Sequence, residues 1–216
     1  MSAHAFYPEL KLYHYWRSSS SWRVRWVLAF KGIPWTGIPV DLLKNESESP
    51  EHFARNPLGF VPALETEGRF LGESMAIIDY LESLKPEPSV FPRDPWLRAR
   101  TWELTEIIVS DTQPLQNLNP QELHSSDPEA KKAWAKYWIE RGLHAFETRA
   151  RETAGKFAIG DSLGLADMVL IPQLYNALRY DVNLELFPIC SRIWESCKAE
   201  SSYQQSEPVR FQPEKD

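Results

Sequence analysis

The chain has 216 residues and a formal net charge of −6, a length that suits one large domain or two small ones. Charged residues make up 25% and apolar residues 43%, the balance of an ordinary soluble protein. Lysine and arginine do not cluster apart from acidic neighbours, so we expect no nucleic-acid partner. The first residues lack the pattern of a signal peptide, and no segment approaches the about 18 apolar residues of a membrane span. We therefore expect a cytoplasmic protein without membrane contact.

The cysteines, histidines and sequence motifs of the chain argue against several enzyme classes. The two cysteines, Cys190 and Cys197, are spaced too widely for a Cys-x-x-Cys redox pair, and we interpret them as ordinary thiols. The five histidines show no metal-ligand spacing, so we expect no metal site. Motifs for phosphate loops, dinucleotide binding, zinc proteases and serine hydrolases do not occur in the sequence.

Residues 11–85 alternate between strand-like and helix-like segments. Alternating aromatic and apolar residues predict strands, and apolar residues at helical spacing predict helices. In chain order we expect a strand at 11–15, a helix at 19–31 ending at Gly32, a strand at 35–40 and a short helix or turn at 50–55 ending at Asn56-Pro57. A hairpin at 63–66 and 69–71, turning at Glu67-Gly68, and a helix at 74–85 follow. This order is βαβ followed by αββα.

The second half is helical throughout. Prolines at 86, 88, 92 and 95 indicate a linker. Asp94-Pro95 and Asp127-Pro128 both pair an N-cap residue with a first-turn proline, and an apolar helix starts near Ala166. We predict a first domain over 1–86, a linker over 87–94 and an all-helical domain over 95–216.

The serine run Ser18–Ser21 lies where the first strand gives way to the first helix. Unpaired N–H groups and the positive end of the helix dipole favour an anion there, such as a thiolate, and a hydroxyl can add a hydrogen bond. A free thiol titrates near ~8.5, so such a site raises the thiolate fraction at neutral pH. Serines acting only as N-caps would give the same pattern.

Further features of the sequence have a structural interpretation, a functional one, or both. Val61-Pro62 precedes a strand; in a thioredoxin-like fold this proline is cis and the preceding backbone pairs with a peptide ligand, although a proline can also simply start a strand. Glu73-Ser74 starts a helix and fits a carboxylate or a plain cap. Asp167, three residues into a helix, is interpreted as a structural cap. Trp16, Trp22 and Trp26 surround the first helix and favour core packing over an aromatic pocket.

Together these features resemble the zeta class of the glutathione transferase superfamily, the maleylacetoacetate isomerases. The resemblance spans nearly the whole chain, with matching stretches at 11–25 (KLYHYWRSSSSWRVR), 39–44 (PVDLLK), 56–64 (NPLGFVPAL), 73–82 (ESMAIIDYLE), 113–118 (QPLQNL), 165–180 (LADMVLIPQLYNALRY) and 208–213 (PVRFQP).

The resemblance implies a fold and a cofactor. It implies a thioredoxin-like α/β N-terminal domain, an all-helical C-terminal domain, a homodimer and glutathione as cofactor. The residues that it assigns to glutathione are Ser18, Ser19 and Ser20 near the sulfur, Ser47 near the glycine end, Val61 and Pro62 at the cysteinyl backbone, Glu73 and Ser74 at the γ-glutamyl carboxylate, and Gln113 and Asn117 around the cofactor. Arg17 and Arg179 match arginines that hold substrate carboxylates.

The implied reaction is a cis–trans isomerisation of a maleyl di-acid by thiolate addition, rotation and elimination, in tyrosine and phenylalanine catabolism. The chain departs from the family pattern at five positions: Ser20 replaces a cysteine, Ser47 and Glu73 each replace a glutamine, Phe60 replaces a polar residue, and Gly164 replaces a serine or threonine cap. A hydroxyl is a poor nucleophile at neutral pH, so Ser20 does not reproduce a reactive cysteine. A glutathione transferase or dehalogenase acting on another electrophile, and a non-catalytic binding module with this fold, are the alternatives.

Overall fold

The computed structural model describes residues 7–213. Its chain divides into two compact units. The first is formed by the chain up to Ser89 together with the chain from Ser201 onward, and the second runs from Val90 to Glu200. The second boundary differs from the predicted division, in which everything after the linker belonged to the helical domain. The chain from Ser201 packs with the first unit because Trp22 and Trp26 donate their indole N–H groups to the hydroxyls of Ser206 and Ser202, at 3.2 and 3.1 Å.

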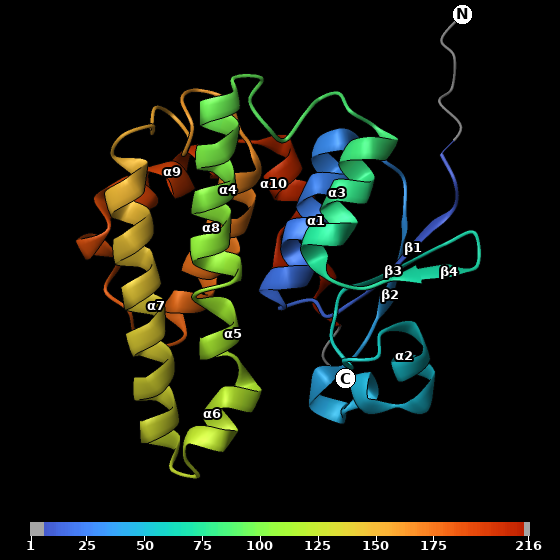
Figure 1. Cartoon of the computed structure of the whole chain (residues 1–216). Helices are drawn as coiled ribbons and strands as arrows, with labels where there is room; N and C mark the ends of the chain where they lie inside the picture. Colours follow the sequence, from blue (N-terminus) through green and yellow to red (C-terminus); the bar gives the residue numbers. More distant parts are fainter. Residues whose placement is uncertain (1–6, 214–216) are drawn as a thin grey trace, which may run out of the picture. The chain divides into compact units, whose positions relative to one another are not determined.

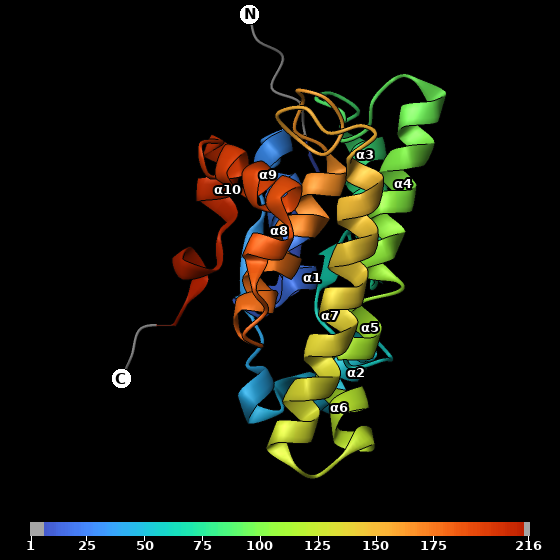
Figure 2. The ribbon, with the colours of Figure 1, turned by 90° about the vertical axis from the view of Figure 1, so that its left-hand side faces the viewer.

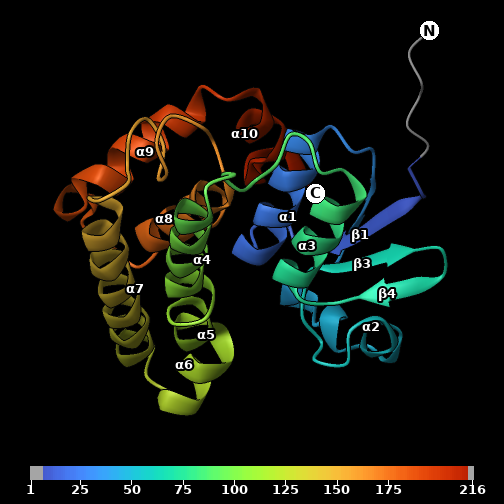
Figure 3. The same cartoon turned by 45° about the horizontal axis from the view of Figure 1, so that its top comes forward.

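A mixed four-stranded sheet organises the first unit (Figure 3). Its strands lie in the order β2-β1-β3-β4, with β1 at Leu10–His14, β2 at Thr36–Pro39, β3 at Ala63–Thr66 and β4 at Arg69–Leu71. β1 pairs parallel with β2 and antiparallel with β3, which pairs antiparallel with β4. The β3–β4 turn has positive φ at both Glu67 and Gly68, the conformation of a tight hairpin turn. The predicted order, βαβ followed by αββα, is confirmed.

Two long helices of the first unit, α1 (Ser19–Lys31) and α3 (Ser74–Leu84), run side by side (Figure 1). Gly32 ends α1 in the left-handed conformation, as predicted. The unit also contains α2 (Pro50–Arg55), α10 (Ser201–Ser206) and the 3-10 turns η1 (Leu42–Lys44), η2 (Glu46–Glu48) and η4 (Pro208–Phe211). α1 is buried on more than one face, because α10 covers the side that carries Trp22 and Trp26.

The regular elements of the second unit are all helices (Figure 2), and the loop after α7 adds one isolated parallel bridge between Ala154 and Gly160. Its helices are α4 (Pro95–Val109), α5 (Gln113–Gln116), α6 (Leu118–His124), α7 (Pro128–Ala150), α8 (Leu165–Leu178) and α9 (Pro188–Lys198), with a 3-10 turn η3 (Leu184–Leu186). The carboxylates of Asp94 and Asp127 cap α4 and α7 as predicted. α8 supplies the core, since its residues from Leu165 to Leu174 are all buried.

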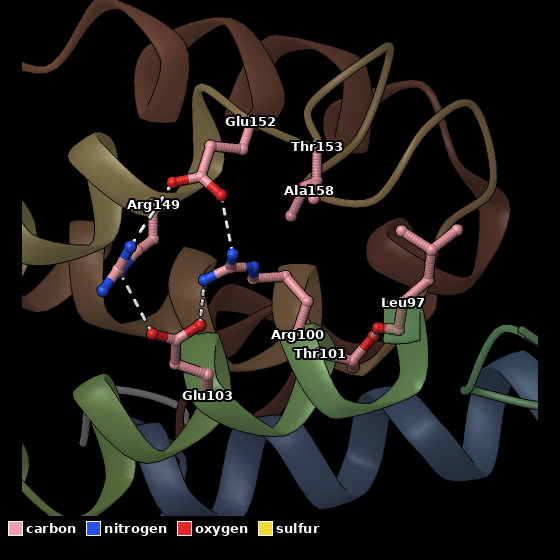
Figure 4. A network of polar contacts seen from close by, with 8 residues as sticks. All are labelled: Leu97, Arg100, Thr101, Glu103, Arg149, Glu152, Thr153 and Ala158. Atoms are coloured by element: carbon pink, nitrogen blue, oxygen red, sulfur yellow. Dashed lines mark hydrogen bonds and ion pairs between the residues drawn. The ribbon is translucent and has the colours of Figure 1, made fainter. Parts of the chain in front are cut away.

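A polar network joins α4 to the end of α7 (Figure 4). Arg100, which is buried, binds Glu103 and also Glu152, the latter at 2.6 Å. Arg149 closes the network through Glu103 at 3.0 Å and Glu152 at 3.4 Å. No helix among residues 7–213 is long and apolar enough to cross a membrane.

Candidate functional site

The turn that delivers Ser18 to the start of α1 is held by a short set of hydrogen bonds. The Ser18 N–H donates to the Tyr15 carbonyl at 3.2 Å, which closes the turn. The Ser18 hydroxyl oxygen then accepts from the Ser21 N–H at 3.2 Å, and the Ser18 carbonyl accepts from the Trp22 N–H at 2.9 Å. Ser18 is therefore the N-cap of α1.

The cap leaves the Ser18 proton available. A hydroxyl has one donor and two acceptor positions, and the cap uses only an acceptor. The side chain is half-buried, at the helix end whose dipole attracts anions. The cap interpretation and the anion-binding interpretation are therefore compatible rather than exclusive.

Ser20 has a different environment. Its hydroxyl oxygen accepts a hydrogen bond from the Arg23 guanidinium at 3.0 Å, and Arg23 itself is buried. An alcohol in this position stays protonated at neutral pH, so Ser20 serves as an acceptor and not as a nucleophile. Ser19 lies between the two and is also half-buried.

The loop from Asn56 to Pro62 forms a second wall of the site. The Val61-Pro62 bond is cis, as the resemblance implies. The Phe60 carbonyl is held from two sides, by the Asn56 amide and by the His52 imidazole, each at 3.0 Å. Gly59 has φ +67°, and a Cβ there would lie 2.9 Å from the Phe53 ring, so the loop needs glycine at this point.

Val61 combines a buried side chain with an unpaired backbone. Its side chain packs in a cluster with Tyr15 and Val40, against which Trp16 also packs, so the loop lies against the turn that ends at Ser18. Within residues 7–213, the N–H and C=O of Val61 form no hydrogen bond. Such a segment can pair with an extended peptide backbone in the manner of an added strand.

The start of α3 lies next to the same loop. The ideal Cβ position of Gly72 is 3.3 Å from the Asn56 side chain, which places Glu73 and Ser74 beside the residue that holds Phe60. Glu73 has φ 57°, a strained value for a residue other than glycine that is typical of functional sites. Ser74 is buried, and its hydroxyl forms no hydrogen bond with the other described residues.

Ser47 approaches this loop from the other side. It is buried in η2, and its carbonyl oxygen lies 3.1 Å from the ideal Cβ position of Gly59. The first unit thus brings Ser18, Ser47, Val61 and Ser74 around one loop. Sequence reasoning assigned no role to Asn56 and His52, which position that loop. The signals for Asn56 were the Asn56-Pro57 pair, interpreted as the end of a helix, and its place at the start of the matching stretch 56–64.

The remaining predicted site residues are Arg17 in the first unit and Gln113, Asn117 and Arg179 in the second. Arg17 is half-buried, and its guanidinium lies 5.3 Å from the centre of the Trp16 ring. In the second unit, Gln113 is buried at the start of α5, and Asn117 caps α6 through a hydrogen bond from the Leu118 N–H at 3.1 Å. Arg179 is exposed, and it donates to the Asn176 side chain at 3.1 Å.

A polar cluster in the second unit positions Asn176. The Gln116 side-chain oxygen accepts from the amides of Gln173 and Asn176, at 3.2 and 3.1 Å. Gln121 donates to the Gln116 carbonyl at 2.6 Å and to the Tyr180 hydroxyl at 3.0 Å. The arginine at 179 is thus attached through Asn176 to a buried amide network, which sequence reasoning did not identify because glutamines carry no periodic signal.

The cysteines and Asp167 are structural, as predicted. Burial raises the pKa of both the Cys190 and the Cys197 thiol, and both side chains are fully buried. Asp167 accepts from the Gly164 N–H at 2.9 Å and the Ala158 N–H at 2.8 Å, so it closes the start of α8. Among the described residues, no group of three or more His, Cys, Asp or Glu side chains is arranged to hold a metal ion.

Comparisons with known proteins agree with this geometry. The N-terminal domain model of glutathione S-transferases matches residues 8–83. Probable maleylacetoacetate isomerase 2 of Drosophila melanogaster is 42% identical, over 91% of this chain and 87% of its own length. The crystal structure of maleylacetoacetate isomerase from Anaeromyxobacter dehalogenans 2CP-1, with glutathione bound in its active site, is 45% identical with a TM-score of 0.86, over 96% of this chain and 99% of that one.

A third relative identifies the class. The holo structure of a bacterial maleyl pyruvate isomerase, described as a glutathione S-transferase of the zeta class, is 33% identical with a TM-score of 0.90 and covers 95% of this chain and 100% of its own. The thioredoxin-like domain with a helical remainder is confirmed by these neighbours. The chain belongs to the glutathione S-transferase family and, within it, to the zeta class that includes the maleylacetoacetate isomerases.

Proposed function

We propose that this protein is a glutathione-dependent cis–trans isomerase acting on maleylacetoacetate or a closely related maleyl di-acid. The observation that carries the proposal is the Ser18 hydroxyl, whose oxygen is fixed by the Ser21 N–H while its proton remains available at the start of α1. A thiolate held there would gain a hydrogen bond from the hydroxyl and the favourable field of the helix.

The first unit offers groups for the rest of glutathione. The unpaired N–H and C=O of Val61 fit a peptide backbone. The Ser74 hydroxyl and the start of α3 fit the γ-glutamyl carboxylate, and the Glu73 carboxylate fits the ammonium group. Ser47 would lie toward the glycine end, and Ser19 and Ser20 beside the sulfur. We also propose Gln113 and Asn117 as cofactor contacts, as the family resemblance implies.

The chain's own residues would have two tasks in the reaction. Bound glutathione would supply the thiolate that adds reversibly to the cis double bond and leaves after rotation. Ser18 would hold that sulfur in its ionised form, and Arg17 and Arg179 would bind the substrate carboxylates. Arginine suits this task because its planar fork binds a carboxylate through two parallel hydrogen bonds.

A second candidate function follows from Ser20. The family cysteine is replaced here by a hydroxyl that accepts from Arg23, and this change is compatible with a glutathione transferase or dehalogenase acting on another electrophile. We propose in addition that the protein is a cytoplasmic homodimer, as the family resemblance implies, and that it serves aromatic amino-acid breakdown.

The test combines binding with turnover. Titration calorimetry with glutathione should show binding, and the protein should convert maleylacetoacetate to the trans product only when glutathione is present. Binding without isomerisation, but with loss of thiol when a halogenated acid is added, would favour the second function. If the protein showed neither glutathione binding nor turnover, both proposed functions would be refuted and a non-catalytic binding module would remain.

A control variant addresses Ser20 directly. Ser20→Cys restores the family residue next to the proposed sulfur site. A rate that changes little would show that glutathione alone supplies the attacking sulfur. A large rise in the isomerase rate would show that the native chain is adapted to a different electrophile.

A further inference from the structure

One buried arginine, Arg25, links the C-terminal segment, from Ser206 to Phe211, to the turn before Ser18. Arg25, on α1, is 1% exposed. Its guanidinium donates to the Trp16 carbonyl at 2.9 Å and to the Tyr15 carbonyl at 3.3 Å. The Tyr15 carbonyl is the same group that accepts from the Ser18 N–H. Arg25 therefore fixes the turn that places Ser18 at the start of α1.

The other side of Arg25 is held by the C-terminal segment. Its Nε donates to the Ser206 carbonyl at 3.2 Å. The Phe211 ring lies 4.5 Å from the guanidinium carbon, with its face toward the cation, and it also contacts the rings of His14 and Trp35. A cation over an aromatic face, away from water, is attracted by the ring electrons.

The electrostatics of this cluster make the contacts mutually dependent. Among the described residues, no carboxylate forms an ion pair with Arg25. Its facing groups are the carbonyls of Tyr15, Trp16 and Ser206, the imidazole of His14 at 3.3 Å, and the Phe211 ring. Because an unpaired buried charge is costly, Arg25 depends, within residues 7–213, on these carbonyls, the imidazole and the Phe211 ring to offset its desolvation.

His14 reinforces this arrangement by staying neutral. Burial, with Arg25 as a second cause, lowers the pKa of His14 to about 3, so its Nδ1 can accept from Arg25 throughout the physiological range. Burial also lowers the pKa of Arg25 to about 9. The guanidinium therefore remains a cation at neutral pH, and its donors stay directed at the turn.

We propose that Arg25 is a positioning residue for the thiol site, and that the C-terminal segment from Ser206 to Phe211 is a structural part of that site although it contributes no ligand to it. This proposal rests on the proposed function only for its catalytic consequence. The segment overlaps the stretch 208–213 that the family resemblance includes, and the cap geometry of Ser18 depends on it through Arg25.

The test uses two variants and two matched controls. Arg25→Lys keeps the charge but loses the planar fork that binds three carbonyls. Phe211→Ala removes the ring and leaves every hydrogen bond of Arg25 in place. Arg100→Lys, at the buried arginine of the second unit (Figure 4), controls for the loss of a buried guanidinium. Phe70→Ala, on the edge strand β4, controls for the loss of a phenylalanine.

The first readout is amide hydrogen exchange without glutathione. The amides of Ser18, Ser21 and Trp22 are all hydrogen-bonded within the turn and cap. We expect them to exchange about tenfold faster in Arg25→Lys, the change that follows from losing about one hydrogen bond. Phe211→Ala should give a smaller rise, and neither control should change these amides. Equal exchange in Arg25→Lys and Arg100→Lys would overturn the proposal.

The second readout is functional. We expect a KM for glutathione about tenfold higher in Arg25→Lys, with the alkaline shift of the pH–rate profile that a less stabilised thiolate produces. Arg100→Lys should lower the melting temperature without either change. If the wild-type protein binds no glutathione, the proposed function fails while the exchange result still decides the role of Arg25. If Arg25→Lys does not fold, the amide exchange of Phe211→Ala, compared with that of Phe70→Ala, tests the proposal instead.

Discussion

Ser18 can be changed in two ways that separate its helix cap from its hydroxyl donor. Ser18→Ala removes both the oxygen that accepts from the Ser21 N–H and the proton that would bind the thiolate. Ser18→Asp keeps a cap of equal quality and places a negative charge at the helix start, where the dipole favours it. The aspartate has no proton to donate at neutral pH, and it repels a thiolate.

The magnitudes follow from the two interactions. Losing the cap costs about 1 kcal/mol of folding stability. Losing a hydrogen bond to a charged sulfur costs about 1.5–3 kcal/mol of binding, which corresponds to about a ten- to hundredfold fall in kcat/KM. Ser18→Ala should therefore lose both stability and activity. Ser18→Asp should keep its stability and lose at least as much activity.

The assay pairs urea unfolding with glutathione-dependent isomerisation for each variant. Asp94→Ala serves as the control, because it removes the cap of α4, in the second unit, and should cost stability without changing the KM for glutathione. If Ser18→Asp kept the wild-type kcat/KM, the hydroxyl would not be the thiolate donor. If the activity of the Ser18 variants fell only as far as their loss of stability explains, as we expect for Asp94→Ala, the role of the hydroxyl as thiolate donor would be contradicted as well.

Three further predictions concern stability and reactivity. Cys190 and Cys197 are fully buried with raised pKa values, so a thiol reagent should label the native protein far more slowly than the urea-unfolded protein; rapid native labelling would contradict their burial. Gly142→Ala should destabilise by about 1–3 kcal/mol in urea unfolding, because the new Cβ would lie 1.9 Å from the Thr112 hydroxyl; an unchanged midpoint would show that Thr112 moves aside. Burial raises the pKa of Asp167 from 3.8 to about 7. The stability that this carboxyl contributes is therefore present below its ordinary pKa and lost as the pH rises toward 7. The stability difference between wild type and Asp167→Asn should shrink over that interval, and a constant difference would refute the shift.

Local signals in the sequence were sufficient to predict most of the helices and strands. The caps at Asp94 and Asp127, the stop at Gly32 and the turn at Glu67-Gly68 each depend on a few adjacent residues. Such signals need no knowledge of the rest of the fold. They located α1, α2, α4 and α7 and both strands of the hairpin.

The docking of the C-terminal segment could not be predicted in the same way. Trp22, Arg25 and Trp26 form a face of α1 that is neither uniformly apolar nor plainly exposed. Their partners, Ser202 and Ser206, lie about 180 residues later in a six-residue helix with no periodic signal. The contact depends on indole N–H groups finding hydroxyls, which only the folded chain shows.

Gly164 shows a second limit of sequence reasoning. The sequence identified it as a weak substitute for a serine or threonine cap. In the structure a Cβ at this position would lie 3.0 Å from the Val90 carbonyl oxygen, which accepts from the Leu165 N–H at 2.9 Å. Here close packing of a distant backbone, and not cap preference, accounts for the glycine.

Only part of the candidate site could be predicted from the sequence, for a similar reason. Ser18, Val61 and Ser74 lie at element boundaries that the sequence marks, and the family resemblance attached a role to each. Asn56 and His52 act by holding the Phe60 carbonyl, and Arg25 by holding carbonyls of the turn before Ser18. No local pattern distinguishes such a residue from an ordinary polar side chain.

The stoichiometry of glutathione during turnover tests the central claim most directly. Proton NMR can follow the vinyl protons of the maleyl substrate and the glutathione resonances in one sample that contains substrate in large excess over glutathione. An isomerase predicts complete conversion to the trans product with all of the glutathione recovered as free thiol. Conversion that stopped when the glutathione was consumed, or no conversion by a protein that binds glutathione, would contradict it.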